Sequence, residues 1–258
     1  MTNSQAKTAP GFKDHFSGQA TAYAKFRPQY PKSLFEFIAV QSPNDKLAVD
    51  CATGNGQAAI ALAEFFQKVI ALDASAAQIE SAQPNDRVEY RVAPAEATGL
   101  PANSCAALTV AQALHWFDLE AFYAEARRVL VRDGVLAVWA YNYLRISPEV
   151  EVILRHFHDD VVGPHWPPER KTVGNGYLNL PFPFAEITAR HFEIEVQWDL
   201  AQLLGYLGTW SATQRYMAAN NGRDPVELIR DQLDQAWGNT HEQRRVVWPL
   251  TVRVGRSG

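Results

Sequence analysis

The chain has 258 residues, of which 47% are hydrophobic and 20% charged, enough to bury the core of one α/β domain with a modest cap. Its formal net charge is −4 and like charges form no long runs, so we expect no nucleic acid partner. No apolar stretch reaches the length of a membrane span or a signal-peptide core, which predicts a cytoplasmic protein with no membrane partner.

Strands and helices are expected to alternate in the first half of the chain. Residues 1–30 are predicted to form a tail and a lid segment rich in aromatic residues, and Pro31 is placed to open the first helix. Apolar runs predict strands near residues 46–50, 68–73, 87–92, 106–111 and 134–141. Helices are predicted between them, near residues 57–66, 75–83 and 118–130. This alternation is typical of a parallel sheet with right-handed crossovers.

The alternation weakens beyond residue 142. Here the pattern predicts a helix near 148–160, a loop-like run to residue 183, a strand near 186–198, helices near 200–218 and 224–237, and a last strand near 246–254. Asp224 and Pro225 are suited to be the N-cap and first residue of the last helix. Because no repeat or linker is visible, we expect residues 31–258 to form a single domain with a cap inserted at about 142–185.

A glycine-bearing turn follows the first predicted strand and points to a bound nucleoside. Gly54 and Gly56 permit close approach of the backbone to a ligand, where a Cβ would clash. Asp73, at the end of the second predicted strand, can accept hydrogen bonds from a ribose diol. An adenosine-containing ligand is therefore the first hypothesis.

The turn alone leaves two adenosine ligands open. Residues 54–59 fit the G-x-G-x-x-A variant of a dinucleotide fingerprint, which would suit NAD. Asp50, at the end of the first strand, favours instead a sulfonium ligand with an ammonium group, because negative charge stabilises that group and would not help to bind a pyrophosphate.

Further segments follow in an order typical of one family. They are residues 91–101, 111–118, 126–130 and 134–139. In this order the chain resembles class I S-adenosylmethionine-dependent methyltransferases, nearest to the type 11 and trans-aconitate methyltransferase-like branch. The resemblance covers residues 12–141 and extends loosely to residues 205–211 and 247–250. It implies a Rossmann-like, doubly wound, mostly parallel seven-stranded sheet with an antiparallel last strand, and S-adenosyl-L-methionine as the cofactor.

The resemblance also implies roles for particular residues. Asp50 and the glycines would line the methionine end of the cofactor, and Asp73 its ribose. The family commonly has glycine at the position of Ala52 and an adenine-contacting acid at that of Pro94, so adenine would rely on neighbouring residues. The predicted cofactor-binding residues are Tyr23, Arg27, Asp50, Ala52, Gly54, Gly56, Asp73, Ala74, Ala95, Glu96 and Gln112.

His115 and Trp116 are the predicted catalytic residues, because the family places residues near the methyl group after the fourth strand. A carboxylate acceptor is already ionised at neutral pH and needs no base, whereas an amine or hydroxyl acceptor would make His115 a candidate base. The predicted substrate-binding residues are Arg145, Trp166 and Arg215, with Arg170 and Lys171 as further cations for a carboxylate. Two histidines and two aspartates at 156–160 suggest a metal cluster by composition, but their spacing better fits a solvated helix end, so we expect no metal.

The predicted function is S-adenosylmethionine-dependent methyl transfer to a small molecule, in particular a carboxylate. One alternative is a methyltransferase-fold cofactor-binding or regulatory protein without turnover. Another is a nicotinamide-dependent oxidoreductase, which is disfavoured because no Tyr-x-x-x-Lys pair is visible. The sequence identifies neither the acceptor nor the oligomeric state.

Overall fold

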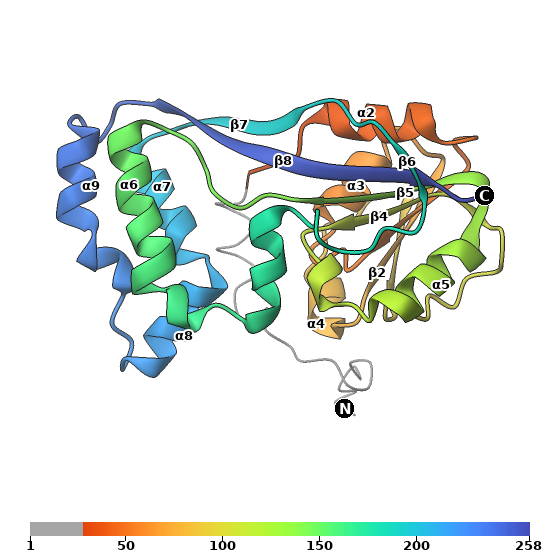
Figure 1. Ribbon diagram of the computed structural model, residues 1–258, viewed down its shortest axis with the longest axis horizontal. Helices are drawn as coiled ribbons and strands as arrows, with labels where there is room; N and C mark the ends of the chain where they lie inside the picture. Colours follow the sequence, from red (N-terminus) through yellow and green to blue (C-terminus); the bar gives the residue numbers. More distant parts are fainter. Residues whose placement is uncertain (1–27) are drawn as a thin grey trace.

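The computed structural model describes residues 28–258 of the chain (Figure 1). The predicted tail and lid segment at residues 1–30 therefore lies outside the described residues except for its last three. Tyr23 and Arg27, two of the predicted cofactor-binding residues, also fall outside them.

Within the described residues, eight strands form a sheet in the order β3-β2-β1-β4-β5-β8-β6, and β7 also pairs with β8. The strands are β1 (Leu47–Cys51), β2 (Lys68–Asp73), β3 (Val88–Val92), β4 (Cys105–Ala111), β5 (Leu130–Ala140), β6 (Ala185–Ile187), β7 (Phe192–Trp198) and β8 (Arg244–Arg256). Strands β1 to β5 pair in parallel, and β8 runs antiparallel to β5. The expectation of a mostly parallel, Rossmann-like sheet with an antiparallel last strand is confirmed.

The strand expected at residues 186–198 is broken into two pieces. β6 pairs with the end of β8 next to the main sheet, and β7 pairs with the first part of β8, from Arg244 to Leu250. The expectation of one continuous strand was wrong, because β8 is 13 residues long and continues beyond the sheet. The two pieces together take the place of the expected sixth strand, and β8 is the expected seventh.

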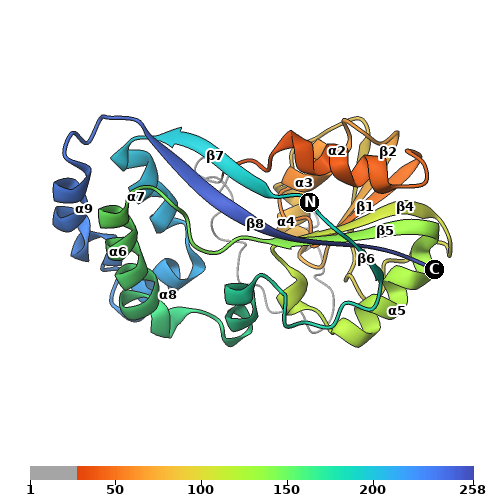
Figure 2. The same ribbon diagram turned by 45° about the horizontal axis from the view of Figure 1, so that its top comes forward.

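Helices cover both faces of the sheet, as a doubly wound fold requires. They are α2 (Lys32–Gln41), α3 (Gln57–Leu62), α4 (Ala76–Glu80) and α5 (Leu119–Val129). Successive strand residues alternate between two cores: Ala48 packs in the core that includes α2 and α3, and Val49 packs in the core that includes α5. Figures 1 and 2 show α2 and α5 on opposite sides of the sheet.

A second, helical lobe is attached to the sheet by β7 and β8 (Figures 1 and 2). Its principal helices are α6 (Pro148–His156), α7 (Leu200–Gly208), α8 (Ser211–Ala219) and α9 (Arg230–Trp237). Short helical turns connect these elements: η2 (Phe157–Val161), η3 (Gly163–His165), η4 (Pro168–Asn175) and η5 (Pro225–Leu228). The lobe thus takes α6 from the predicted cap range and the other three helices from residues 200–237, which the sequence analysis left outside the cap.

Local signals in this lobe are partly confirmed. Asp224 accepts a hydrogen bond from the backbone N–H of Val226, so it is an N-cap as predicted, but the helix it opens is the short turn η5. The helix expected at 200–218 is interrupted at Thr209, where α7 ends. Among the described residues, no helix combines the length and the apolar surface that crossing a bilayer requires.

Candidate active site

The ends of β1, β2 and β4 meet where the strand order of the sheet reverses. The order changes direction between β1 and β4, which follow each other in space but not in sequence. Ligands of open α/β sheets bind outside the carboxyl ends of the strands at such a point. Asp50 and Asp73 lie at the ends of β1 and β2, and Gln112 directly follows β4, so the structure brings these three predicted residues to one edge.

The turn after β1 depends on three residues in the left-handed region of backbone conformation. The φ angles are 52° at Ala52, 58° at Gly54 and 88° at Gly56. A Cβ at Gly56 would clash with the ring of Tyr90, whereas a Cβ at Gly54 would meet its nearest neighbouring atom at 3.7 Å. Gly56 is thus required by packing and by its φ angle, and Gly54 by its φ angle alone. Ala52 holds the strained conformation without the freedom of glycine.

Asp73 joins the turns that follow β1 and β2. One carboxylate oxygen accepts the backbone N–H of Gly54 at 2.9 Å, and the other accepts the backbone N–H of Ser75 at 2.8 Å. The residue is 7% exposed. The carboxylate therefore holds the two turns together at the edge of the sheet.

Asp50 is bound entirely by hydroxyl groups. Thr53 Oγ1 and Thr109 Oγ1 each donate to one of its carboxylate oxygens at 2.6 Å. Burial raises the pKa of Asp50 to about 6, against the opposing effect of the two hydrogen bonds. The carboxylate therefore ties the turn after β1 to β4. Its predicted contact with the methionine end of the cofactor stays a prediction.

Gln112 presents an unusual acceptor beside this turn. Its side-chain Nε2 donates to the backbone oxygen of Tyr141 at 2.9 Å, and its backbone is left-handed with φ 56°. Its Oε1 is buried and has no hydrogen-bond partner among the described residues. Buried acceptors without partners are rare, so this atom is a candidate ligand contact.

Of the residues predicted to contact adenine, only Glu96 contacts the start of α5. Glu96 accepts the backbone N–H of Asp118, the N-cap of α5, at 3.0 Å. Ala95 is 5% exposed and belongs to the core on the α5 side of the sheet, and Ala74 directly follows β2. Their roles toward adenine stay predictions.

His115 is a half-buried histidine that packs against two aromatic side chains. Its Nδ1 lies 2.9 Å from the hydroxyl oxygen of Tyr177, and its ring lies 4.7 Å from that of Trp116. Desolvation, together with the smaller effect of the positive charge of Arg170, lowers the pKa of His115 to about 3. At neutral pH the imidazole is uncharged and a poor proton acceptor. The sequence analysis missed Tyr177 as the partner of His115, because the two residues are 62 positions apart and no motif connects them.

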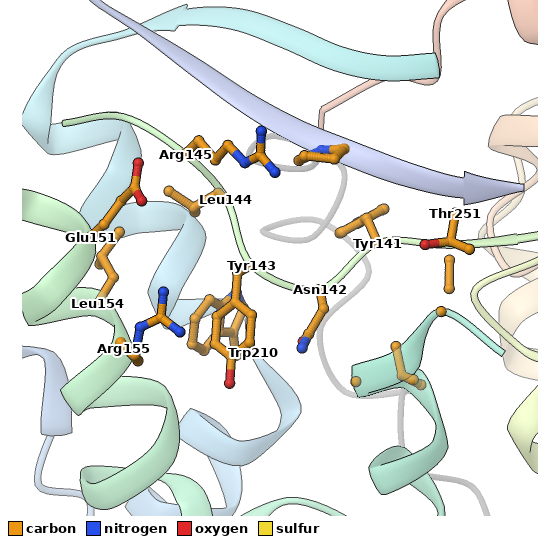
Figure 3. A pocket seen from close by; sticks show the side chains of 15 residues that line it. Tyr141, Asn142, Tyr143, Leu144, Arg145, Glu151, Leu154, Arg155, Trp210 and Thr251 are labelled. Atoms are coloured by element: carbon orange, nitrogen blue, oxygen red, sulfur yellow. The ribbon is translucent and has the colours of Figure 1, made fainter. Parts of the chain in front are cut away.

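A pocket of about 300 Å³ lies between the end of β5 and the second lobe (Figure 3). It is lined by residues 140–145 after β5, by part of α6 with Glu151 and Arg155, and by Thr251 of β8. Figure 3 shows Arg145 and Arg155 on the side of the second lobe and Thr251 across from them. Neither arginine forms an ion pair with a described residue.

The pocket adjoins the residues that follow β4. Tyr141, which lines it, accepts the hydrogen bond of Gln112, and Gly176, which also lines it, precedes the Tyr177 that contacts His115. The edge formed by the ends of β1, β2 and β4 therefore lies next to this pocket.

Of the three predicted substrate-binding residues, only one lines this pocket. Arg145 lines the pocket. Trp166 does not line it but packs 5.6 Å from the ring of Trp210, which does, and the guanidinium of Arg170 lies 4.2 Å from its ring centre. Arg215 lies on α8 outside the pocket lining. Arg155, which the sequence analysis missed, lines the pocket from α6; it occupies a polar helix position that carries no motif.

The chain is similar to known methyltransferases over nearly its whole length. Residues 49–138 match the model of a methyltransferase domain. A Dictyostelium discoideum protein described as a candidate methyltransferase is 32% identical over 244 residues, which make up 93% of this chain and 92% of that protein. A Saccharomyces cerevisiae protein named as an S-adenosylmethionine-dependent methyltransferase is 30% identical over 140 residues, 51% of this chain and 47% of that protein.

A solved structure agrees with these sequence matches. It is described as a candidate type II methyltransferase from Anaeromyxobacter dehalogenans and superposes with a TM-score of 0.84 at 45% identity. The match covers 90% of this chain and 98% of that one. At this identity and coverage the likeness extends to both lobes.

Replacing Ala52 with glycine is expected to stabilise the protein by about 0.5–1 kcal/mol, because the cost of a left-handed alanine exceeds the entropy that glycine adds to the unfolded chain. Urea unfolding of wild type and Ala52→Gly measures the difference. A free energy of unfolding that falls on substitution would show that the turn is not strained at this position.

Asp50 is expected to make stability depend on pH. Its pKa is raised on folding, so between about pH 4 and pH 6 the folded chain keeps a proton that the unfolded chain has lost. The contribution of this group to the free energy of unfolding is therefore present below the window and is lost as the pH rises through it, by up to about 3 kcal/mol. Asp50→Asn should flatten this part of the pH dependence in urea unfolding, whereas a control change at the exposed Asp86 should not. Equal slopes in wild type and Asp50→Asn would contradict the assignment.

Proposed function

We propose that this chain, which belongs to the class I S-adenosylmethionine-dependent methyltransferases, methylates a small molecule that carries a carboxylate. S-Adenosylmethionine is the cofactor, and when bound it supplies an electrophilic methyl group on a sulfonium. The pocket between β5 and the second lobe carries the proposal for the acceptor. Its volume of about 300 Å³ suits a small ligand, and its two arginines without ion partners among the described residues suit an anion.

We assign the cofactor to the edge formed by the ends of β1, β2 and β4. Asp73 is the acceptor for the ribose hydroxyls, because its carboxylate lies at the carboxyl end of β2 and contacts the glycine-bearing turn after β1. Gln112 Oε1 is the acceptor for the ammonium group, since this buried atom has no partner among the described residues. The left-handed turn through Gly54 keeps the backbone clear of side chains where the ligand approaches.

The chemistry of this acceptor requires orientation rather than proton transfer. A carboxylate is ionised at neutral pH, and burial holds the pKa of His115 to about 3, so His115 cannot serve as a base there. Arg145 and Arg155 would pair with the carboxylate and align it with the methyl group. Because charge is neutralised along this path, a dry pocket does not oppose it, and alignment supplies much of the rate.

Two further parts of the proposal rest on the sequence. We propose that the protein is cytoplasmic. We also propose that it has no nucleic acid partner, which its formal net charge of −4 supports. The finer relation to the trans-aconitate methyltransferase-like branch stays a prediction.

Asp73→Ala is expected to weaken binding of S-adenosylhomocysteine by about a hundredfold, because a carboxylate that accepts ribose hydroxyls is worth a few kcal/mol. Isothermal calorimetry measures the affinity, and circular dichroism checks that the variant is folded. Asp86→Ala, a change at an exposed aspartate, is the control and should bind as wild type does. A folded Asp73→Ala variant with unchanged affinity would rule out the ribose assignment.

Arg155→Ala and Arg145→Ala are expected to raise KM for an acceptor acid by about tenfold with little change in kcat, as expected for binding lost equally from the ground and transition states. A panel of small carboxylic acids supplies the acceptor, and Arg132→Ala, at an exposed position of β5, is the control.

His115→Ala should leave a rate that does not vary with pH above about pH 6. If instead the wild-type rate rises through about pH 7 and this rise is lost in His115→Ala, His115 is a base and the acceptor is an amine or hydroxyl.

A further inference from the structure

One negative side chain lies among the positive side chains of the pocket between β5 and the second lobe. Glu151 of α6 lines this pocket together with Arg145 and Arg155. Figure 3 shows all three side chains on the side of the second lobe. Within the described part of the chain, no ion pair joins Glu151 to either arginine. The pocket therefore contains opposite charges that do not neutralise each other by direct contact.

The carboxylate of Glu151 is held by the backbone. The residue lies in the first turn of α6 and is half-buried. Its Oε1 accepts the backbone N–H of Ile146, in the segment that leads into this helix, at 3.0 Å. This hydrogen bond orients the carboxylate through one of its oxygens. A ligand in the pocket can donate to the other oxygen, Oε2.

The two arginines are held by other parts of the structure. The backbone N–H of Arg145 donates to the oxygen of Val247 on β8 at 2.7 Å, and the N–H of Val247 donates back at 2.9 Å. The guanidinium carbon of Arg155 lies 5.2 Å from the ring centre of Tyr143. Contacts with β8 and with an aromatic ring thus hold the positive groups, while the N–H of Ile146 holds the negative one.

Tyr143 is itself fixed by the turn η2. Its hydroxyl donates to Oδ1 of Asp159 at 2.8 Å, and its ring centre lies 4.8 Å from that of His158. Nδ1 of His158 lies 2.6 Å from the same aspartate oxygen, and the histidine side chain is 14% exposed. The expectation of a solvated helix end was therefore wrong for His158. Among the described residues, no group of histidine, cysteine and carboxylate side chains is arranged to hold a metal ion.

Opposite charges on one wall of a pocket are complementary to a ligand that carries both charges close together. Arginine binds a carboxylate through its fork of N–H groups, and a carboxylate accepts hydrogen bonds from an ammonium group. A second carboxylate on the ligand would be repelled by Glu151, whereas an ammonium group would be attracted to it. The apolar part of the lining consists of buried side chains, namely Tyr141, Leu154, Val173 and Trp210. These suit an apolar or aromatic side chain on the ligand.

We infer that the pocket binds an amino acid with an apolar or aromatic side chain, whose ammonium group contacts Glu151 and whose carboxylate contacts Arg145 and Arg155. The inference rests on the proposed function, in which this ligand is the methyl acceptor. Glu151 favours the protonated amine, which has no lone pair, so a carboxylate oxygen remains the nucleophile. This oxygen gains the methyl group, and the electron pair of the broken carbon–sulfur bond stays on sulfur. The product is a methyl ester, and no proton is released.

Matched pairs of acids test the contact with the ammonium group. Phenylalanine and 3-phenylpropanoate differ only by this group, as do leucine and 4-methylpentanoate. Calorimetry on the full chain saturated with S-adenosylhomocysteine measures the affinities. In at least one pair, wild type should bind the amino acid about tenfold more tightly than its counterpart, because the ammonium group adds a charge-assisted hydrogen bond. Equal affinities within both pairs overturn the inference.

Two substitutions in the first turn of α6 show whether Glu151 causes the preference. Glu151→Gln keeps an oxygen that can accept the N–H of Ile146 but removes the charge, so the variant should fold and bring the ratio of affinities near one. Glu149→Gln removes a charge from the same turn at an exposed position outside the pocket lining, and should leave the ratio unchanged. A preference that survives in Glu151→Gln, or that is lost equally in Glu149→Gln, overturns the inference.

The position of the transferred methyl group separates this inference from the proposed function. Mass spectrometry of the product distinguishes a methyl ester from an N-methyl amino acid. If the methyl group is on nitrogen, or neither amino acid is methylated, the proposed carboxylate acceptor fails, and the affinities of wild type and Glu151→Gln still decide whether the ammonium group binds Glu151. If the simple carboxylic acids are methylated and Glu151→Gln changes no ratio, the proposed function stands and the inference fails.

Discussion

Two buried carboxylates hold the edge of the sheet in the shape on which the rest of the site depends. Asp50 accepts hydroxyls from the turn after β1 and from β4, and Asp73 accepts amides from the turns after β1 and β2. Together they tie three neighbouring strand ends into one rigid edge. These contacts hold Ala52 in its strained left-handed conformation. The turn is therefore preorganised, so that binding of a ligand there would not have to pay for reshaping the backbone.

The two carboxylates differ in what surrounds them, and this difference separates their roles. Asp50 is buried and accepts two hydroxyl donors, and burial raises its pKa; it holds the turn after β1 against β4. Asp73 binds backbone amides of two turns and lies at the carboxyl end of β2, where open α/β sheets bind their ligands. An acid at the end of β2 can therefore both shape the turn and bind the ribose.

The pocket proposed for the methyl acceptor depends on the long last strand, β8. β8 continues from the sheet into the second lobe, where β7 pairs with it, and this extension places α6 opposite the end of β5. A β-bridge between Arg145 and Val247 secures the crossing segment to β8. The pocket that results contains positive side chains, and its histidine neighbours are neutral: burial lowers the pKa of both His115 and His158. Such a site is suited to orient an anion and is poorly suited to move a proton.

Local sequence patterns were sufficient to predict the backbone framework of the edge proposed for the cofactor. The apolar runs that become β1 to β5, the glycine turn and the acid at the end of β2 are all readable within short windows, because strand and turn conformations depend on neighbouring residues. The break between β6 and β7 was not readable, since it follows from the length of β8 and its departure from the sheet. For the same reason, the sequence indicated an inserted cap but did not reveal that residues 200–237 supply most of its helices.

The side-chain partners that complete the site depend on contacts between distant residues. His115 was predicted from its place after the fourth strand, but its neutrality arises from burial and from contact with Tyr177, 62 residues away. His158 and its aspartate are adjacent in sequence and resemble an exposed pair, yet packing of Trp166 and Trp210 buries the imidazole. The sequence by itself therefore determined the sheet, the glycine turn and the nucleoside-binding class. Only the tertiary structure decided the proposed acceptor pocket and the charge states of the histidines near it, because burial and pairing arise when remote segments pack together.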